Sequence, residues 1–386
     1  MANKRRLSHT GSIILRTVVA LLIVFGALFA ASRTFATVPM SNLGDVFASF
    51  SVKDKSTFPY AVDSASVIRM APVGSGVCVL RAGRCDILNR SGKVLQTVQY
   101  TYSQPAIDTR NGRVLLYERG GTRYMLLSKT KTLYSGETQQ SILTAALADD
   151  GRFAVATTAE SAKSVLTVYK ASGREMFSFK CVSEYVTDIA FSGGGVAVTV
   201  SGVQDAQPYS RLLLLSFKET EPKADLRFAD TIFFHVHSSG KTTAACSKSL
   251  FTVMRSAEKE REEAFDSDTL QFFCADEKGR STMILLPYGN EYASKLRGLQ
   301  ANGKVAFEVE CGEKILAAAR SSSYTAVLTD KAVLTYNNSG TKVGTLTLTD
   351  SARDICLSGQ TLYVLFHDRI ERFPSAGDHT QKTENS

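Results

Sequence analysis

The fold is decided by Ser66–Tyr100, which reads SVIRMAPVGS, GVCVLRAGR, CDILNRSG and KVLQTVQY. Each of these four runs alternates apolar and polar residues and ends in small or polar residues, as antiparallel strands joined by tight turns do. Gly92 occupies the last of these turns, and Gly173, Gly303 and Gly340 occupy the same place in later repeats, where a positive φ is easy only for Gly or Asn. The stretch therefore predicts a four-stranded antiparallel sheet.

The same four-strand pattern recurs along the chain with a period of roughly 40 residues. Residues 142–181 and 315–349 repeat it most clearly. Four-stranded units at this period are typical of the blades of a β-propeller. The turn after the first strand of each unit is marked eight times, by Gly76, Gly112, Gly151, Gly194, Gly240, Gly279, Ser322 and Gly359.

We therefore expect an all-β, eight-bladed propeller over residues 47–374, with seven blades and one long insertion as the alternative. The last unit ends after three strands, and we expect Phe47–Val62 to supply the fourth and close the ring. Two stretches interrupt the pattern: residues 255–268 have a charged, helix-like composition, and residues 203–210 form a polar hairpin tip. The tail, residues 375–386, is polar and is expected to be disordered.

The amino terminus combines a basic cluster with an apolar run. Residues 13–33 supply about twenty mostly apolar positions, which as a helix would span about 30 Å, the thickness of a bilayer core. Lys4, Arg5 and Arg6 form the positive flank that should keep residues 1–12 in the cytoplasm. The side chains expected in the membrane are Ile13, Ile14, Leu15, Val18, Leu21, Leu22, Ile23, Val24, Phe25, Leu28 and Phe29.

This arrangement predicts a retained single-pass anchor, a linker over residues 34–46 and a propeller outside the cell. The alternative is a cleaved signal peptide, which would leave the propeller secreted. The net charge of +8 reflects this terminus, because five of the 45 basic residues and none of the acids fall in the first 36 positions. The remaining charge is nearly balanced and spread along the chain, so we expect no nucleic-acid partner.

The sequence contains no recognisable catalytic or metal-binding motif. The seven cysteines form no CxxC pair, and we expect buried thiols, with Cys78 and Cys85 on adjoining strands as candidates for a disulfide. His235 and His237 project from the same face of one strand, but no third ligand is visible, so we predict no metal and no cofactor. GxSxG, HExxH and phosphate-loop motifs are absent, and no catalytic residue is assigned.

The repeat pattern resembles the broad WD40-like and quinoprotein-like propeller group over residues 50–373. The chain has no Trp, so it lacks the WD dipeptide and the tryptophan motifs of those families. Its layout, with turns such as Ser91-Gly92-Lys93 and Asn302-Gly303-Lys304, is similar to an uncharacterised family of membrane-anchored propellers from Gram-positive bacteria. The resemblance implies this architecture and supplies no active residues.

These observations predict a non-enzymatic binding or scaffold module at the outer face of the cell membrane. One flat end of the propeller would bind a protein, a peptide or a cell-wall polymer. The alternative is an exported hydrolase or lyase, in which two carboxylates meet across the central channel without forming any linear motif.

Overall fold

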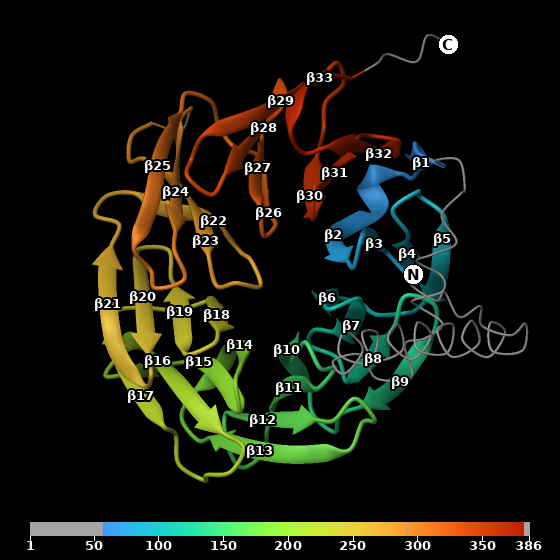
Figure 1. The fold of residues 1–386 in the computed structure, drawn as a ribbon. Coiled ribbons are helices and arrows are strands. Elements are labelled where there is room, and N and C mark those ends of the chain that lie inside the picture. Colours follow the sequence, from blue (N-terminus) through green and yellow to red (C-terminus); the bar gives the residue numbers. More distant parts are fainter. Residues whose placement is uncertain (1–56, 291, 382–386) are drawn as a thin grey trace, which may run out of the picture. The chain divides into compact units, whose positions relative to one another are not determined.

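The computed structural model describes residues 57–290 and 292–381, and this part of the chain is built almost entirely from strands. The strands form eight antiparallel sheets arranged in a ring (Figure 1). The helical structure within the described residues is the short 3-10 turn η2 (Ser64–Ser66), capped by the Asp63 side chain, which accepts the Ala65 N–H at 2.9 Å. The eight-bladed prediction is confirmed, and the seven-bladed alternative is wrong.

Each blade has four strands, which we call A to D from the channel outward, and the first four blades follow the chain without interruption. Blade 1 is β2 (Val67–Val73), β3 (Gly76–Arg81), β4 (Arg84–Leu88) and β5 (Val94–Gln99). Blade 2 is β6 (Pro105–Arg110), β7 (Arg113–Glu118), β8 (Arg123–Leu127) and β9 (Thr132–Glu137). Blade 3 is β10 (Ile142–Leu147), β11 (Phe153–Thr158), β12 (Ser164–Tyr169) and β13 (Glu175–Cys181). Blade 4 is β14 (Tyr185–Ser192), β15 (Gly195–Gln204), β16 (Gln207–Ser216) and β17 (Ala224–Ala229).

The last four blades continue the pattern, with changes in blades 7 and 8. Blade 5 is β18 (His235–Ser239), β19 (Thr242–Cys246), β20 (Leu250–Arg255) and β21 (Glu258–Ala264). Blade 6 is β22 (Thr269–Ala275), β23 (Ser281–Leu286), β24 (Ser294–Leu299) and β25 (Val305–Cys311). Blade 7 is β26 (Ala317–Arg320), β27 (Tyr324–Leu328), β28 (Ala332–Asn337) and β29 (Lys342–Thr347), with β33 (Gly377–Thr380) added outside. Blade 8 is β30 (Asp354–Ser358), β31 (Thr361–Leu365), β32 (Arg369–Pro374) and the early strand β1 (Tyr60–Ala61).

The ring closes through β1, which pairs antiparallel with β32 and so supplies the D strand of blade 8. This confirms that the segment before the first blade donates the missing strand. The Tyr60 hydroxyl also donates to the Asp86 carboxylate of blade 1 at 3.2 Å, so β1 contacts both blades at the closure. Such pairing leaves no open edge between the two ends of the ring.

The core consists of eight apolar clusters, and each cluster lies between two neighbouring blades. The cluster between blades 2 and 3 shows how: Phe153 of blade 3 is fully buried and packs against Tyr124 of blade 2 with ring centroids 5.5 Å apart. Full burial of such a side chain stabilises the fold by about 1.5–3 kcal/mol. An open row of eight sheets would have only seven such interfaces, and the eighth joins blade 8 to blade 1 through Val62, Met70 and Tyr363.

Two local expectations need correction. Residues 255–268 do not interrupt the repeat, because β21 within them pairs with β20 as the exposed D strand of blade 5. An edge strand needs charged side chains to prevent pairing with other chains, and this explains the helix-like composition. The tail is not wholly disordered, because β33 pairs in parallel with β29 and covers the edge of blade 7.

The predicted anchor lies outside the described residues, and so do Lys4, Arg5, Arg6, the linker and all eleven apolar side chains assigned to the membrane. Among residues 57–290 and 292–381, no helix is long and apolar enough to cross a membrane.

Candidate functional site

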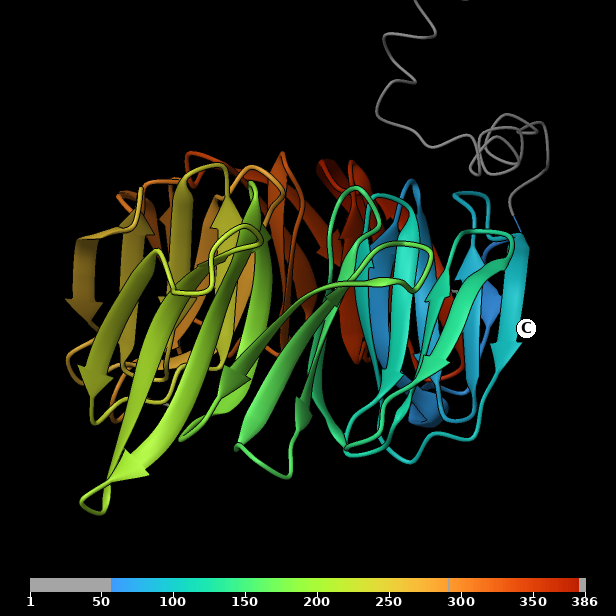
Figure 2. The same ribbon diagram turned by 90° about the horizontal axis from the view of Figure 1, so that it is seen from below.

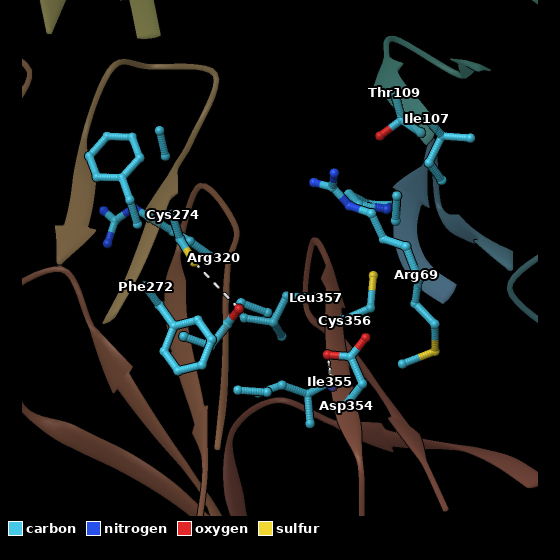
Figure 3. Close-up of a pocket in the computed structure, with 18 of the residues that line it drawn as sticks. Arg69, Ile107, Thr109, Phe272, Cys274, Arg320, Asp354, Ile355, Cys356 and Leu357 are labelled. Carbon is cyan, nitrogen blue, oxygen red and sulfur yellow. Dashed lines mark hydrogen bonds between the residues drawn. The ribbon is translucent and has the colours of Figure 1, made fainter. Parts of the chain in front are cut away.

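The central channel is the first candidate site, because the A strands of all eight blades line it. Two hollows of about 460 and 290 Å³ occupy it, and they share Arg69, Asp108, Arg110 and His237 as common wall residues. Figure 3 shows Arg69 reaching into the larger hollow from one wall, with Phe272 on the wall opposite. The channel is therefore lined by charged, polar and apolar side chains.

Three aspartates from the A strands of blades 2, 4 and 8 line this channel. Asp108 accepts the Leu147 N–H of blade 3 at 2.7 Å, and Asp188 accepts the Val236 N–H of blade 5 at 2.8 Å. Asp354 likewise accepts a main-chain hydrogen bond from the next blade, at Met70. Each carboxylate thus links the A strand of its own blade to the A strand of the next blade by a hydrogen bond.

Burial in the channel changes the pKa of these carboxyl groups. Burial raises the pKa of Asp108 and of Asp354, and it raises the pKa of Asp188 to about 7, with a smaller contribution from the charge of Asp108. Main-chain N–H donors oppose the shift in all three cases because they favour the charged form. The carboxyl groups are held by hydrogen bonds and yet are poorly solvated.

Basic side chains accompany these aspartates. Arg110 pairs with Asp149 at 3.5 Å. Within residues 57–290 and 292–381, the guanidinium groups of Arg69 and Arg119 have no hydrogen-bond or ion-pair partner, although Arg69 acts electrostatically on Asp108. The channel therefore holds charges of both signs, with no concentration of either.

His235 and His237 both face the channel, as their spacing on one strand predicts. Burial lowers the pKa of His237 to about 4, so its imidazole is neutral at neutral pH. His235 stacks on Phe273 with ring centroids 5.7 Å apart. Among the residues that the structure describes, no group of three or more His, Cys, Asp or Glu side chains could hold a metal ion.

All seven cysteines are free thiols, and six of them are buried. The Sγ atoms of Cys78 and Cys85 lie 3.3 Å apart in hydrogen-bond contact, so the candidate pair is adjacent but unbridged. The hydrogen bond to Cys85, together with burial, raises the pKa of Cys78. Cys274 donates a hydrogen bond to the Ala318 carbonyl across the interface between blades 6 and 7. Six of the thiols therefore pack as small apolar groups, and Cys274 links two neighbouring blades.

The turns of the ring emerge on two opposite faces, because strands alternate in direction within each blade. The B–C hairpins and the D–A connections between blades form one face, and their described residues carry eleven acids and six bases. We call this the acidic face. The A–B and C–D turns form the other, with thirteen bases and six acids, which we call the basic face.

This sorting corrects the expectation that charge is spread evenly beyond the amino terminus. The near balance of acids and bases over the whole propeller conceals a separation between its two ends.

Exposed apolar side chains gather on the acidic face. Ten large hydrophobic side chains of the described residues are exposed, and eight lie in its connections or within two residues of them. Tyr288 and Tyr292, both in the B–C loop of blade 6, are more than 80% exposed. The other six are Ile68, Val182, Tyr185, Val203, Ile232 and Leu316. Exposed aromatic and aliphatic groups on one face are typical of a protein-binding surface.

The acidic face also carries the longest hairpin of the ring. Strands β15 and β16 have ten residues each, and their tip extends past the rim of the propeller (Figure 2). The turn residues Asp205 and Ala206 both have positive φ, and Val203 beside them is 71% exposed. Arg227 stiffens the hairpin, because its guanidinium lies over the Tyr209 ring at 4.0 Å and donates to Gln204.

Sequence reasoning missed these features for different reasons. The channel aspartates lie on three of the eight A strands, so no repeated residue type marks them. Tyr288 and Tyr292 had a readable signal, since two Tyr residues in a loop with Pro287 and Gly289 cannot be strand core.

The geometry defines a closed eight-bladed β-propeller with a polar channel and two chemically distinct faces. The sequence matches a family of unknown function, DUF5711, over residues 45–373. This covers most of the chain, which therefore belongs to that family. A comparison with curated proteins finds no match.

Solved structures with the same kind of fold include the C-terminal WD40 domain of Sif2, which is 11% identical with a TM-score of 0.57. The alignment covers 83% of this chain and 98% of that one. Sqt1 of Saccharomyces cerevisiae is 9% identical, with a TM-score of 0.56 and coverage of 82% and 98%. AztD of Citrobacter koseri is 11% identical, with a TM-score of 0.52 and coverage of 75% and 88%. At these identities the similarities establish the propeller fold alone.

Proposed function

We propose that this chain is a membrane-anchored binding module outside the cell, which binds a protein partner through its acidic face. The observation that carries the proposal is the gathering of eight of the ten exposed large hydrophobic side chains on that face. The excess of acids there favours a partner whose contact surface combines apolar and basic groups. Anchoring and export rest on residues 1–33 of the sequence.

The proposal favours binding over catalysis because of how the channel carboxylates are used. A hydrolase would need two carboxyl groups free to act on a common substrate atom. Here Asp108, Asp188 and Asp354 are each engaged by main-chain N–H groups of a neighbouring blade. The raised pKa of Asp188 still suits a general acid, so the exported hydrolase or lyase stays the second candidate.

The binding role can be tested with photo-crosslinking residues placed at Tyr288 and Tyr292 in cells that express the full chain. Val94 and Val305 are the matched control positions, because they are also exposed but lie beside the basic face. We expect one protein to be captured from the Tyr positions and not from the controls. That protein, once purified, should bind the full chain at least about tenfold more weakly when both Tyr288→Ser and Tyr292→Ser are present, since interface aromatics dominate affinity.

The thermal midpoint of this variant should stay unchanged, because both side chains are exposed. Equal capture at all four positions, or unchanged affinity of the variant, would contradict the acidic face as the binding surface. The membrane anchoring and the location outside the cell are tested separately, by the mass of the mature chain and by protease access in intact cells. An intact amino terminus on a protease-sensitive propeller is expected from a retained anchor, and a shortened chain would instead indicate a cleaved signal peptide.

A further inference from the structure

Several bases of the basic face have no ion-pair partner among the described residues. Its A–B and C–D turns contain thirteen bases against six acids. Among the described residues, eight of these bases are exposed and have no ion-pair partner: Arg90, Lys131, Lys170, Arg174, Lys218, Lys241, Lys278 and Lys304. They come from blades 1 to 6, so the positive charge extends over three quarters of the ring.

The chain enters the ring at this same face. The Thr57 main-chain N–H donates to the Ser91 carbonyl at 2.8 Å, and its hydroxyl donates to the same oxygen at 3.1 Å. Ser91 belongs to the C–D turn of blade 1, which is part of the basic face. Whatever precedes Thr57 is therefore joined to the propeller on the side that carries the positive charge.

We infer that the basic face docks onto a bilayer surface rich in anionic lipids. The inference rests on the proposed membrane anchor. A predicted span that ends at residue 33 leaves 23 residues before Thr57, which reach at most about 80 Å when fully extended. Lipid is thus the anionic surface that this face would meet most often. Docking would leave the acidic face, with Tyr288 and Tyr292, turned toward other proteins.

The recognition is electrostatic, and its chemistry is that of ammonium and guanidinium groups on phosphate headgroups. Each free cation near an anionic bilayer favours the bound state by about fivefold, and the effect decays within a Debye length of about 8 Å at physiological salt. Several turns on the same face therefore act together, whereas a single lysine would give a marginal effect.

The test uses the full chain reconstituted into vesicles of phosphatidylcholine alone or with about one third phosphatidylglycerol. Flotation reports whether the chain is anchored, and mass spectrometry reports how fast an amine reagent labels individual lysines. We expect the basic-face residues Lys241, Lys278 and Lys304 to be labelled about tenfold more slowly on the anionic vesicles. Lys163 and Lys248 on the acidic face should react equally on both.

A charge-reversal variant makes the test specific. Lys241→Glu, Lys278→Glu and Lys304→Glu together should weaken docking by at least about 100-fold, following the fivefold effect of each charge. The protection of Lys170 should then be lost.

The matched control reverses three lysines of the acidic face and changes the net charge equally. It combines Lys163→Glu, Lys248→Glu and Lys331→Glu, and it should leave the protection of Lys170 intact. Circular dichroism checks that both variants are folded. Salt at about 0.5 M should abolish the protection in the unmodified chain, because it shortens the Debye length to about 4 Å.

The outcomes separate docking from anchoring. Flotation with both vesicles and no difference in labelling would overturn lipid docking and leave the anchor standing. Flotation with anionic vesicles alone would support docking and contradict the anchor, and flotation with neither would contradict both. Protection by a soluble polyphosphate without any response to phosphatidylglycerol would assign the face to a free polyanion and overturn the lipid assignment.

Discussion

Replacing Asp188 by Asn separates two opposing effects at this channel carboxylate, the hydrogen bond to the next blade and the cost of burying its charge. In the folded chain the Asp188 carboxylate accepts the Val236 N–H, and burial raises its pKa to about 7 from an ordinary value of 3.8. The folded state therefore binds this proton more tightly than the unfolded state does. The contribution of Asp188 to stability is fully present below about pH 4 and is lost as the pH rises through 7.

The size of the effect follows from the width of this window. A difference of about three pH units in pKa corresponds to about 4 kcal/mol between the two ends of the window. Asn carries no charge and escapes this loss, but its single carbonyl oxygen can accept fewer main-chain N–H groups, which costs about 1 kcal/mol. We expect Asp188→Asn to be about 1 kcal/mol less stable than the unmodified chain near pH 4 and about 3 kcal/mol more stable at pH 8.

The assay is urea unfolding of the full chain in detergent at pH 4.5, 6 and 8. Circular dichroism and tyrosine fluorescence are suitable signals, since the chain has 14 Tyr and no Trp. Asp205→Asn is the control, because Asp205 is exposed at a hairpin tip with φ of 51°, which Asn adopts easily. A stability difference for Asp188→Asn that is unfavourable and equal at pH 4.5 and 8 would refute the reasoning, since it would mean that the ionised carboxylate stabilises the ring.

Two further predictions address the closure and the thiols. Val62→Asp places a charge in the apolar cluster between blades 8 and 1, and should lower the thermal midpoint by at least about 5 °C, whereas Ala61→Asp at the exposed neighbouring position should change it little. Equal midpoints for the two would argue against closure through β1. Cys78 and Cys85 should resist alkylation by N-ethylmaleimide in the folded chain and react once it is denatured, because both are buried and the pKa of Cys78 is raised. Rapid labelling of the folded chain, measured by mass spectrometry, would contradict this.

The blades could be predicted because each strand and turn is determined by residues that are close together in the sequence. Alternating strands and Gly-containing turns are fixed by φ preferences and by the two-residue period of a strand, so Gly92, Gly173, Gly303 and Gly340 all have the positive φ that their positions require. The donated strand was predictable from a count, since three strands in the last unit require a fourth from elsewhere. β33 was not, because its four polar residues pair with β29 from more than 30 positions away.

The candidate site was largely unpredictable because it depends on which side chains share a face or a channel. Asp108, Asp188 and Asp354 belong to three separate blades, and their shared role exists only once the ring is closed. Residues 255–268 resemble an insertion for a related reason, since the charges that protect the edge strand β21 are also good helix formers. Local composition cannot separate these two uses of charge.

The separation of charge between the faces follows from the same repeat that builds the ring. In a four-stranded antiparallel blade the first and third turns emerge at one end, so any residue type favoured after the Gly of these turns is repeated there around the circle. A basic residue directly follows such a Gly at Lys93, Arg152, Arg174, Lys241, Arg280 and Lys304. The chain-wide balance averages these against the acids of the second turns and of the connections between blades, and so conceals both faces. Counting charges by turn number within each repeat, before any coordinates exist, would have exposed the basic face, and it offers a way to find such polarity in other propellers.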